Sequence, residues 1–139
     1  MLRELKEKME AKKAKSKAIA ESKYWREHPQ LQDCLQAMRG SCTLAPAEMH
    51  EAAIAAANIA IHEDIWKAVG ELPRDFITGT VYIVWDDAKL PVLKAPWELV
   101  IENLEDVLRV NFITVLVAET MDRIVWIDSH GTIKLYSIA

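Results

Sequence analysis

Three consecutive residues near the C-terminus, Asp128, Ser129 and His130, carry the side-chain types of a catalytic triad. A working triad is assembled from side chains that converge in space, whereas consecutive residues in a turn point in different directions. Aspartate, serine and the glycine that follows, Gly131, are also the residues that a tight hairpin turn requires. The sequence therefore predicts a structural turn, with His130 exposed as a contact residue.

Two His-Glu pairs, His50-Glu51 and His62-Glu63, have the residue types of metal ligands on a helix. A zinc site on one helix needs its histidines on the same face, for example four residues apart. The two histidines are twelve positions apart, which turns a helix by about 120°. We therefore expect no metal site and no other cofactor.

Thiol and nucleotide chemistry is not indicated either. The two cysteines, Cys34 and Cys42, fit neither a zinc nor a redox spacing. Cys34 falls on an apolar stripe, and Cys42 has no basic neighbour that would favour a thiolate. None of the four glycines belongs to a phosphate-binding loop pattern. We therefore predict that this protein is not an enzyme.

Carboxylates gather in one region of the chain, and they are Asp86, Asp87, Glu98, Glu102, Glu105 and Asp106. The three glutamates have the spacing i, i+4 and i+7, which stacks like charges along one stripe of a helix. No lysine or arginine lies between Pro96 and Leu108 to neutralise them. The stripe is either a solvated helix face or an electrostatic surface that attracts a basic partner and speeds its association.

Two tryptophans, Trp85 and Trp97, lie close to these charges in the sequence. An aromatic anchor beside carboxylates is typical of a tight interface with a cationic protein. We therefore include Trp97 in the predicted binding surface, together with the six acidic residues and His130. The other interpretation places both tryptophans in the core.

Helices are predicted over four segments. Residues 2–27 favour a helical arm by composition but offer little apolar surface for docking. Residues 29–39 carry a clean apolar stripe and end at Gly40, and residues 46–69 are apolar on two sides, which predicts a central, sandwiched helix. Residues 97–109 repeat their apolar residues at helical spacing.

Strands are predicted mainly in the C-terminal half. Residues 80–85 are β-branched and aromatic, and residues 91–96 read as an extended link framed by two prolines. Residues 111–118, 123–128 and 132–138 form an antiparallel meander, whose middle strand is apolar on both faces and therefore internal. The predicted class is α+β: N-terminal helices, then a mostly antiparallel sheet of about four strands with one inserted helix, the helices on one face.

Length and charge limit the possible functions. A chain of 139 residues with 51% hydrophobic and 27% charged residues favours one globular domain. The basic start is followed by no apolar run long enough for a signal peptide or a membrane span, so we expect a cytoplasmic protein. Residues 1–27 carry a net charge of +4 and residues 28–139 a net charge of −8. We predict a basic helical arm over 1–27 and one α+β domain over 28–139.

The C-terminal segment 111–136, NFITVLVAETMDRIVWIDSHGTIKLY, resembles the closing sheet of small bacterial immunity proteins. These proteins neutralise a cognate polymorphic toxin, including the toxins of contact-dependent growth inhibition systems. The shared features are an acidic turn after a strand, the aromatic-centred strand around Trp126, the turn at His130 and Gly131, and a short closing strand. The resemblance implies a toxin as the partner, and it transfers no binding residue to a numbered position.

Together these observations favour a protein-binding module, an immunity protein that occludes a toxin through an acidic surface. The toxin would be basic, with a nuclease as one candidate, because an acidic inhibitor can cover a site that holds phosphates. The alternative is a phage or regulatory accessory protein that uses its basic arm for nucleic acid or self-assembly. An enzyme would require Asp86, Asp87 and Asp128 to meet in one pocket with raised pKa values.

Overall fold

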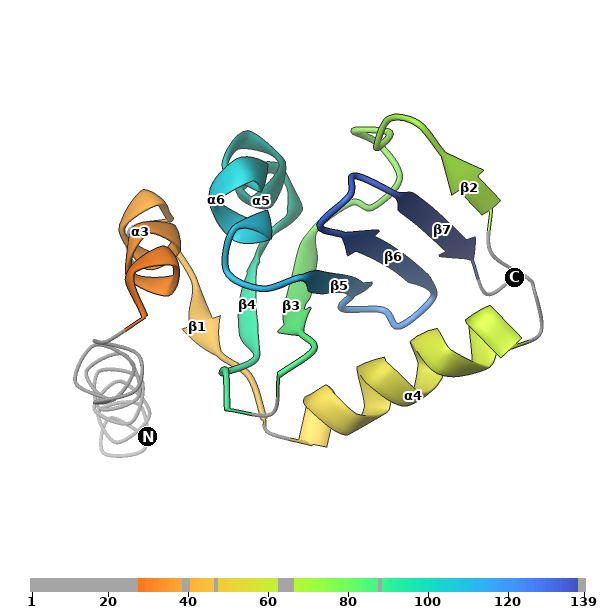
Figure 1. Cartoon of the computed structure of the whole chain (residues 1–139), viewed down its shortest axis with the longest axis horizontal. Coiled ribbons are helices and arrows are strands. Elements are labelled where there is room, and N and C mark those ends of the chain that lie inside the picture. The colour runs from red at the N-terminus through yellow and green to blue at the C-terminus, as the bar shows by residue number, and fades with distance from the viewer. Residues whose placement is uncertain (1–27, 39–40, 47, 63–66, 88, 138–139) are drawn as a thin grey trace, which may run out of the picture.

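The structure is a computed structural model that describes residues 28–38, 41–46, 48–62, 67–87 and 89–137. The arm predicted over residues 1–27 lies outside the described residues. The predicted α+β class is confirmed: helices pack on a sheet whose neighbouring strands all pair antiparallel (Figure 1). None of the described helices has the length and apolar character that a membrane span needs.

One sheet of seven strands organises the molecule, in the order β1-β4-β3-β5-β6-β7-β2. The strands in chain order are β1 (Thr43–Leu44), β2 (Lys67–Val69), β3 (Thr80–Trp85), β4 (Leu93–Pro96), β5 (Ile113–Ala118), β6 (Arg123–Asp128) and β7 (Ile133–Ser137). The prediction of about four strands is therefore too low. The bounds predicted for β3 and β6 are confirmed, and β6 is internal as predicted, since it pairs with β5 and β7.

The three strands that were missed are short. The link predicted over residues 91–96 is extended, but its last four residues form β4, which pairs with β3. The strands β1 and β2 have only two and three residues and are the two edge strands of the sheet. Segments this short carry too few residues to show a period of two, so only their pairing partners define them as strands.

The helices lie on both faces of the sheet, which corrects the prediction of one face. The helices α3 (Pro29–Ala37), α5 (Trp97–Glu102) and α6 (Leu104–Leu108) cover one face. The helix α4 (Glu48–His62) packs against the other face. Figure 1 shows α4 apart from the other three helices.

The strand register explains why both faces need a cover. Across four strands, Leu93, Ile83, Leu116 and Val125 stand opposite one another and are all buried beneath α3, α5 and α6. The alternate residues of the same strands, Val84, Val115 and Val117 among them, are buried on the side of α4. A sheet with two apolar faces is stable only when both are covered.

The helix α4 differs from its prediction in length and position. It ends at His62, not at residue 69, because residues 67–69 pair with β7 as strand β2. It is also an outer helix, not a sandwiched one: Ala53 and Ala57 are buried against the sheet, whereas Glu51 and Ala55 are exposed. The alanines allow the close approach to the sheet that their small size predicts.

The inserted helix is divided in two. Asn103 leaves the helical conformation, with φ −115° and ψ 26°, and its Nδ2 donates to the carbonyl of Leu99 at 2.9 Å. This bond satisfies a carbonyl at the end of α5, and the chain then restarts as α6.

Candidate protein-binding surfaces

The structure separates the predicted binding residues into two groups. The first group, here called the helix surface, consists of Glu98, Glu102, Glu105 and Asp106 on α5 and α6. The second group, here called the sheet-end surface, includes Asp86, Asp87 and His130. These residues follow β3 and β6 at the end of the sheet where Trp85 pairs with Thr114 and Asp128 pairs with Ile113. The helix α5 starts at the opposite end, because Pro96 pairs with Thr80.

The helix surface is acidic and exposed. Glu98, Glu102 and Glu105 are exposed, and the side chain of Glu105 retains 90% of its accessible area. Asp106 is partly buried. Because the helix breaks at Asn103, Glu105 does not continue the stripe of Glu98 and Glu102 along one straight helix.

Two arginines flank these carboxylates. Arg109 lies just beyond the region without basic residues, and its guanidinium is 3.8 Å from Glu105 and 3.8 Å from Asp106. Arg74 shares a hollow of about 330 Å³ with Glu98 and Glu102. The helix surface therefore keeps an excess of negative charge, although less than its four carboxylates alone suggest. Ion pairs as long and exposed as those of Arg109 contribute little to stability.

Trp97 does not belong to either surface. Its side chain is only 1% exposed, and its Nε1 donates to the carbonyl of Arg74 at 2.7 Å. Trp85 is also buried, and its Nε1 donates to the carbonyl of Val107 at 3.0 Å. The prediction of Trp97 as an exposed anchor is therefore wrong, and the interpretation that both tryptophans lie in the core is confirmed. Each indole connects the element that carries it to a segment distant in sequence. The bond of Trp97 also positions Arg74 beside α5.

The sheet-end surface contains a residue that the sequence analysis missed, Phe112. Its side chain is 76% exposed, although a phenylalanine at the start of a strand is an obvious candidate for the core. Its backbone N–H donates to Oδ1 of Asn111 at 2.7 Å. Phe112 precedes β5, which starts at Ile113, and it pairs with no residue in the ladders that join β5 to β3 and β6. The alternation of residues along a strand could not reveal this exposure.

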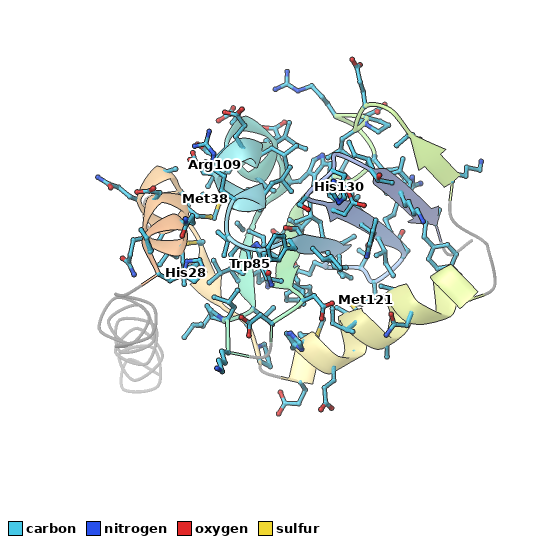
Figure 2. The ribbon with its side chains drawn as sticks, in the orientation of Figure 1. His28, Met38, Trp85, Arg109, Met121 and His130 are labelled. Atoms are coloured by element: carbon cyan, nitrogen blue, oxygen red, sulfur yellow. The ribbon has the colours of Figure 1, made fainter. Side chains whose placement is uncertain are left out.

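The turn after β6 is structural, as predicted. Oδ1 of Asp128 accepts hydrogen bonds from the backbone N–H groups of His130 (2.9 Å) and Thr132 (3.0 Å). Gly131 has φ +83°, a conformation that glycine adopts without strain. His130 itself is exposed, and Figure 2 shows it and Met121 at opposite ends of the β5-β6-β7 meander.

These bonds also set the ionisation of Asp128. Desolvation acts to raise the pKa of this carboxyl, but the hydrogen bonds donated by Thr132 and His130 outweigh it and lower the pKa. A carboxylic acid catalyst needs the opposite, a raised pKa.

The remaining chemistry-bearing residues have structural roles. Nε2 of His50 lies 3.0 Å from the carbonyl of Trp85 and ties α4 to β3, and the side chain of His62 lies outside the described residues. Cys34 and Cys42 are buried free thiols, and burial raises the pKa of Cys34 to about 12. Within the described ranges, no three His, Cys, Asp or Glu side chains are grouped so that they could hold a metal ion.

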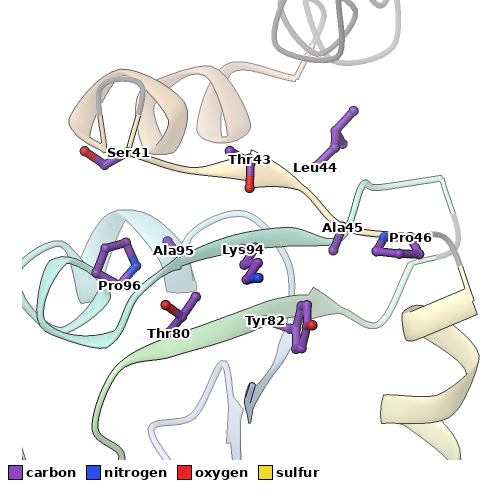
Figure 3. A pocket seen from close by; sticks show the side chains of 10 residues that line it. All are labelled: Ser41, Thr43, Leu44, Ala45, Pro46, Thr80, Tyr82, Lys94, Ala95 and Pro96. Atoms are coloured by element: carbon purple, nitrogen blue, oxygen red, sulfur yellow. The ribbon is translucent and has the colours of Figure 1, made fainter. Parts of the chain in front are cut away.

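A hollow of about 420 Å³ opens between β1 and β3, on the face that carries α4 (Figure 3). Lys94 projects into it, over the ring of Tyr82, and its Nζ donates to Oε1 of Glu119 at 2.9 Å. This hydrogen bond raises the pKa of Lys94, so the amine stays charged and paired. None of the predicted binding residues lines this hollow.

The model of one protein family, described as CdiI immunity protein EcoliA0-like, matches residues 30–136. The chain belongs to this family. No curated protein sequence matches it. The match runs from the first turn of α3 to the last residue but one of β7 and includes both candidate surfaces of this CdiI-family protein, whereas the basic segment 1–27 lies outside it. Membership confirms the resemblance seen in the meander and assigns the chain to the toxin-neutralising immunity proteins.

Proposed function

We propose that this chain neutralises one cognate toxin by binding it and covering its functional surface, without catalysing a reaction. The observation that carries this proposal is the match of an immunity family over residues 30–136. We further infer that it acts in the cytoplasm of the cell that carries it. The alternative, a nucleic-acid or assembly role for the basic segment 1–27, gains no support, because the family match excludes that segment.

The helix surface is the first contact in this proposal. It presents three exposed glutamates on a domain whose residues 28–139 have a net charge of −8. Such a surface raises the association rate of a basic partner through long-range attraction. The long contacts of Arg109 with Glu105 and Asp106 cost little to break, so a cation of the toxin can replace this guanidinium.

Occlusion follows from the same charges. A toxin that acts on phosphates, such as a nuclease, needs a cationic site, and carboxylates that occupy this site exclude the substrate. The pair of Glu98 and Glu102, four residues apart on α5, offers two carboxylates on one side of the helix. The positive charge of Arg74 beside them reduces the electrostatic repulsion between the two glutamates in the free protein.

The partner is identified by capture with the full chain from lysate of the native cell, followed by mass spectrometry. The captured protein is then expressed in a test strain with and without this chain. We expect it to arrest growth alone and to become harmless in the presence of this chain. If the captured protein does not arrest growth, or if this chain does not restore growth, the proposed function is wrong.

The helix surface is tested with the triple variant Glu98→Lys, Glu102→Lys and Glu105→Lys. We expect association with the captured toxin to slow by at least about tenfold at low salt, measured by stopped-flow fluorescence. The control is Glu48→Lys with Glu51→Lys, which reverses two exposed carboxylates on α4, on the other face of the sheet, and should slow association far less. Equal rates for the triple variant and the wild type would remove the helix surface from the mechanism.

A further inference from the structure

Phe112 is held in place at both sides although its ring is exposed. On its N-terminal side Val110 is buried, and on its C-terminal side Ile113 is partly buried against the core cluster on the face of the sheet that carries α4. Its own N–H is fixed by Asn111 at 2.7 Å. An aromatic ring on a fixed backbone loses little conformational freedom when a partner covers it.

Acidic residues stand on the two strands beside the segment that carries this ring. The backbone N–H of Asp86 donates to the carbonyl of Ile113 at 3.2 Å, so Asp86 continues β3 along one side of the segment 112–113. On the other side, Ile113 stands opposite Asp128 in the ladder of β5 and β6. The Asp86 side chain is exposed, and the lowered pKa of Asp128 keeps that carboxyl ionised. The segment that carries the ring thus lies between Asp86, which follows β3, and Asp128, the last residue of β6.

We propose that Phe112, flanked by Asp86 and Asp128, is the anchor of a second toxin-binding surface, which takes an arginine-bearing segment of the toxin. This inference rests on the proposed function and names the chemistry that the toxin must present. The surface lies at the end of the sheet opposite to the start of α5, so it is separate from Glu98 and Glu102.

Arginine fits this surface better than other side chains do. Its planar guanidinium stacks on an aromatic face and at the same time pairs with a carboxylate through two N–H groups. A purely apolar partner would leave Asp86 and Asp128 without a counter-charge, and an acidic partner would be repelled. The helix surface then governs the rate of association, whereas burial of the Phe112 ring governs the rate of dissociation.

The first test uses the full chain and the toxin that the capture experiment identifies. We expect Phe112→Ala to raise the Kd by at least about tenfold, through faster dissociation, as removal of an anchor residue does. We expect Asp86→Asn to raise the Kd as well. The control is Met121→Ala, which truncates the other large exposed apolar side chain of the described residues, in the turn between β5 and β6. It should leave the Kd unchanged.

The second test does not depend on the toxin. A hexa-arginine peptide is titrated into the labelled full chain while amide signals are followed by NMR. Shifts at Phe112, Asp86 and Asp128 that are lost in Phe112→Ala support the surface. Shifts confined to α5 and α6 overturn it, and so does a change below twofold in the Kd of Phe112→Ala for the toxin.

The two proposals fail in different ways. If the wild-type chain fails to protect cells from the captured protein, the proposed function is wrong, and the peptide titration still decides whether the sheet-end surface recognises arginine. If the wild type protects and Phe112→Ala binds as tightly, only the second surface is wrong. A dimer that Phe112→Ala abolishes would assign the surface to a second copy of this chain and overturn the inference. Thermal unfolding of each variant shows that loss of binding is not loss of fold.

Discussion

At the scale of single residues, one carboxyl organises the turn between β6 and β7. Asp128 accepts hydrogen bonds from the backbone N–H groups of His130 and Thr132, and these bonds hold the turn together. These bonds lower its pKa, so Asp128 binds its proton more weakly in the folded than in the unfolded chain. By linkage, its contribution to stability is present above the ordinary carboxyl pKa and is lost as the pH falls through the lower, folded value.

We therefore expect Asp128→Ala to lower the melting temperature at neutral pH, and the difference from the wild type to shrink as the solution is acidified. Thermal unfolding followed by circular dichroism at several pH values measures this. Ser129→Ala, in the same turn and exposed, is the control and should melt like the wild type at every pH. A difference that stays constant down to strong acid would show that the ionised form of Asp128 is not what stabilises the turn.

At the scale of elements, the alanines of α4 determine how closely that helix approaches the sheet. Ala53 is fully buried and packs in the cluster that contains Val84 and Val115. A larger side chain at this position has no space, because protein interiors are already close-packed. Sequence periodicity recognised the alanine face but could not say that a sheet, not a second helix, lies against it.

We expect Ala53→Leu to lower the free energy of unfolding by about 1–3 kcal/mol, the usual cost of overpacking a core. Chemical denaturation gives this value. Ala55→Leu is the matched control, since Ala55 belongs to the same helix but is exposed, and the change there should be within about 0.5 kcal/mol. Equal effects at the two positions would contradict the observed orientation of α4.

At the scale of the whole molecule, the charge of the chain is divided between a basic N-terminal segment and an acidic domain. The family match begins at residue 30, after the basic segment 1–27. We propose that residues 28–139 form the toxin-binding domain by themselves. Removal of residues 1–27 should then leave the Kd for the toxin within about twofold at physiological salt, where charges far from the interface are screened.

Isothermal titration calorimetry of the full and truncated chains with the captured toxin measures the two Kd values. The full chain carrying four of its N-terminal lysines as alanine, at positions 12, 13, 15 and 17, controls for an effect of charge without truncation. Abolished binding by the truncated chain, with its sheet intact by circular dichroism, would instead support the alternative in which the basic segment holds the partner.

Local patterns in the sequence determined the elements that carry their own signal. The β-branched run 80–85 and the meander strands are five or six residues long, which is enough to show whether one face or both are apolar. The helix α3 carries an apolar stripe with a breaker at its end. The turn at Asp128 and Gly131 was equally predictable, since its hydrogen bonds join residues no more than four positions apart. The family resemblance was also carried by a contiguous segment, residues 111–136.

Only the tertiary structure decided what depends on residues distant in the chain. The short strands β1 and β2 are defined only by their pairing with β4 and β7. The sheet is apolar on both faces, and α4 covers one of them. The same holds for the candidate surfaces. Trp97 is buried in the core, where its Nε1 donates to a carbonyl 23 residues earlier, whereas Phe112, one residue before β5, is exposed. Whether a side chain is buried depends on the residues that pack against it, and a local sequence pattern does not identify those residues.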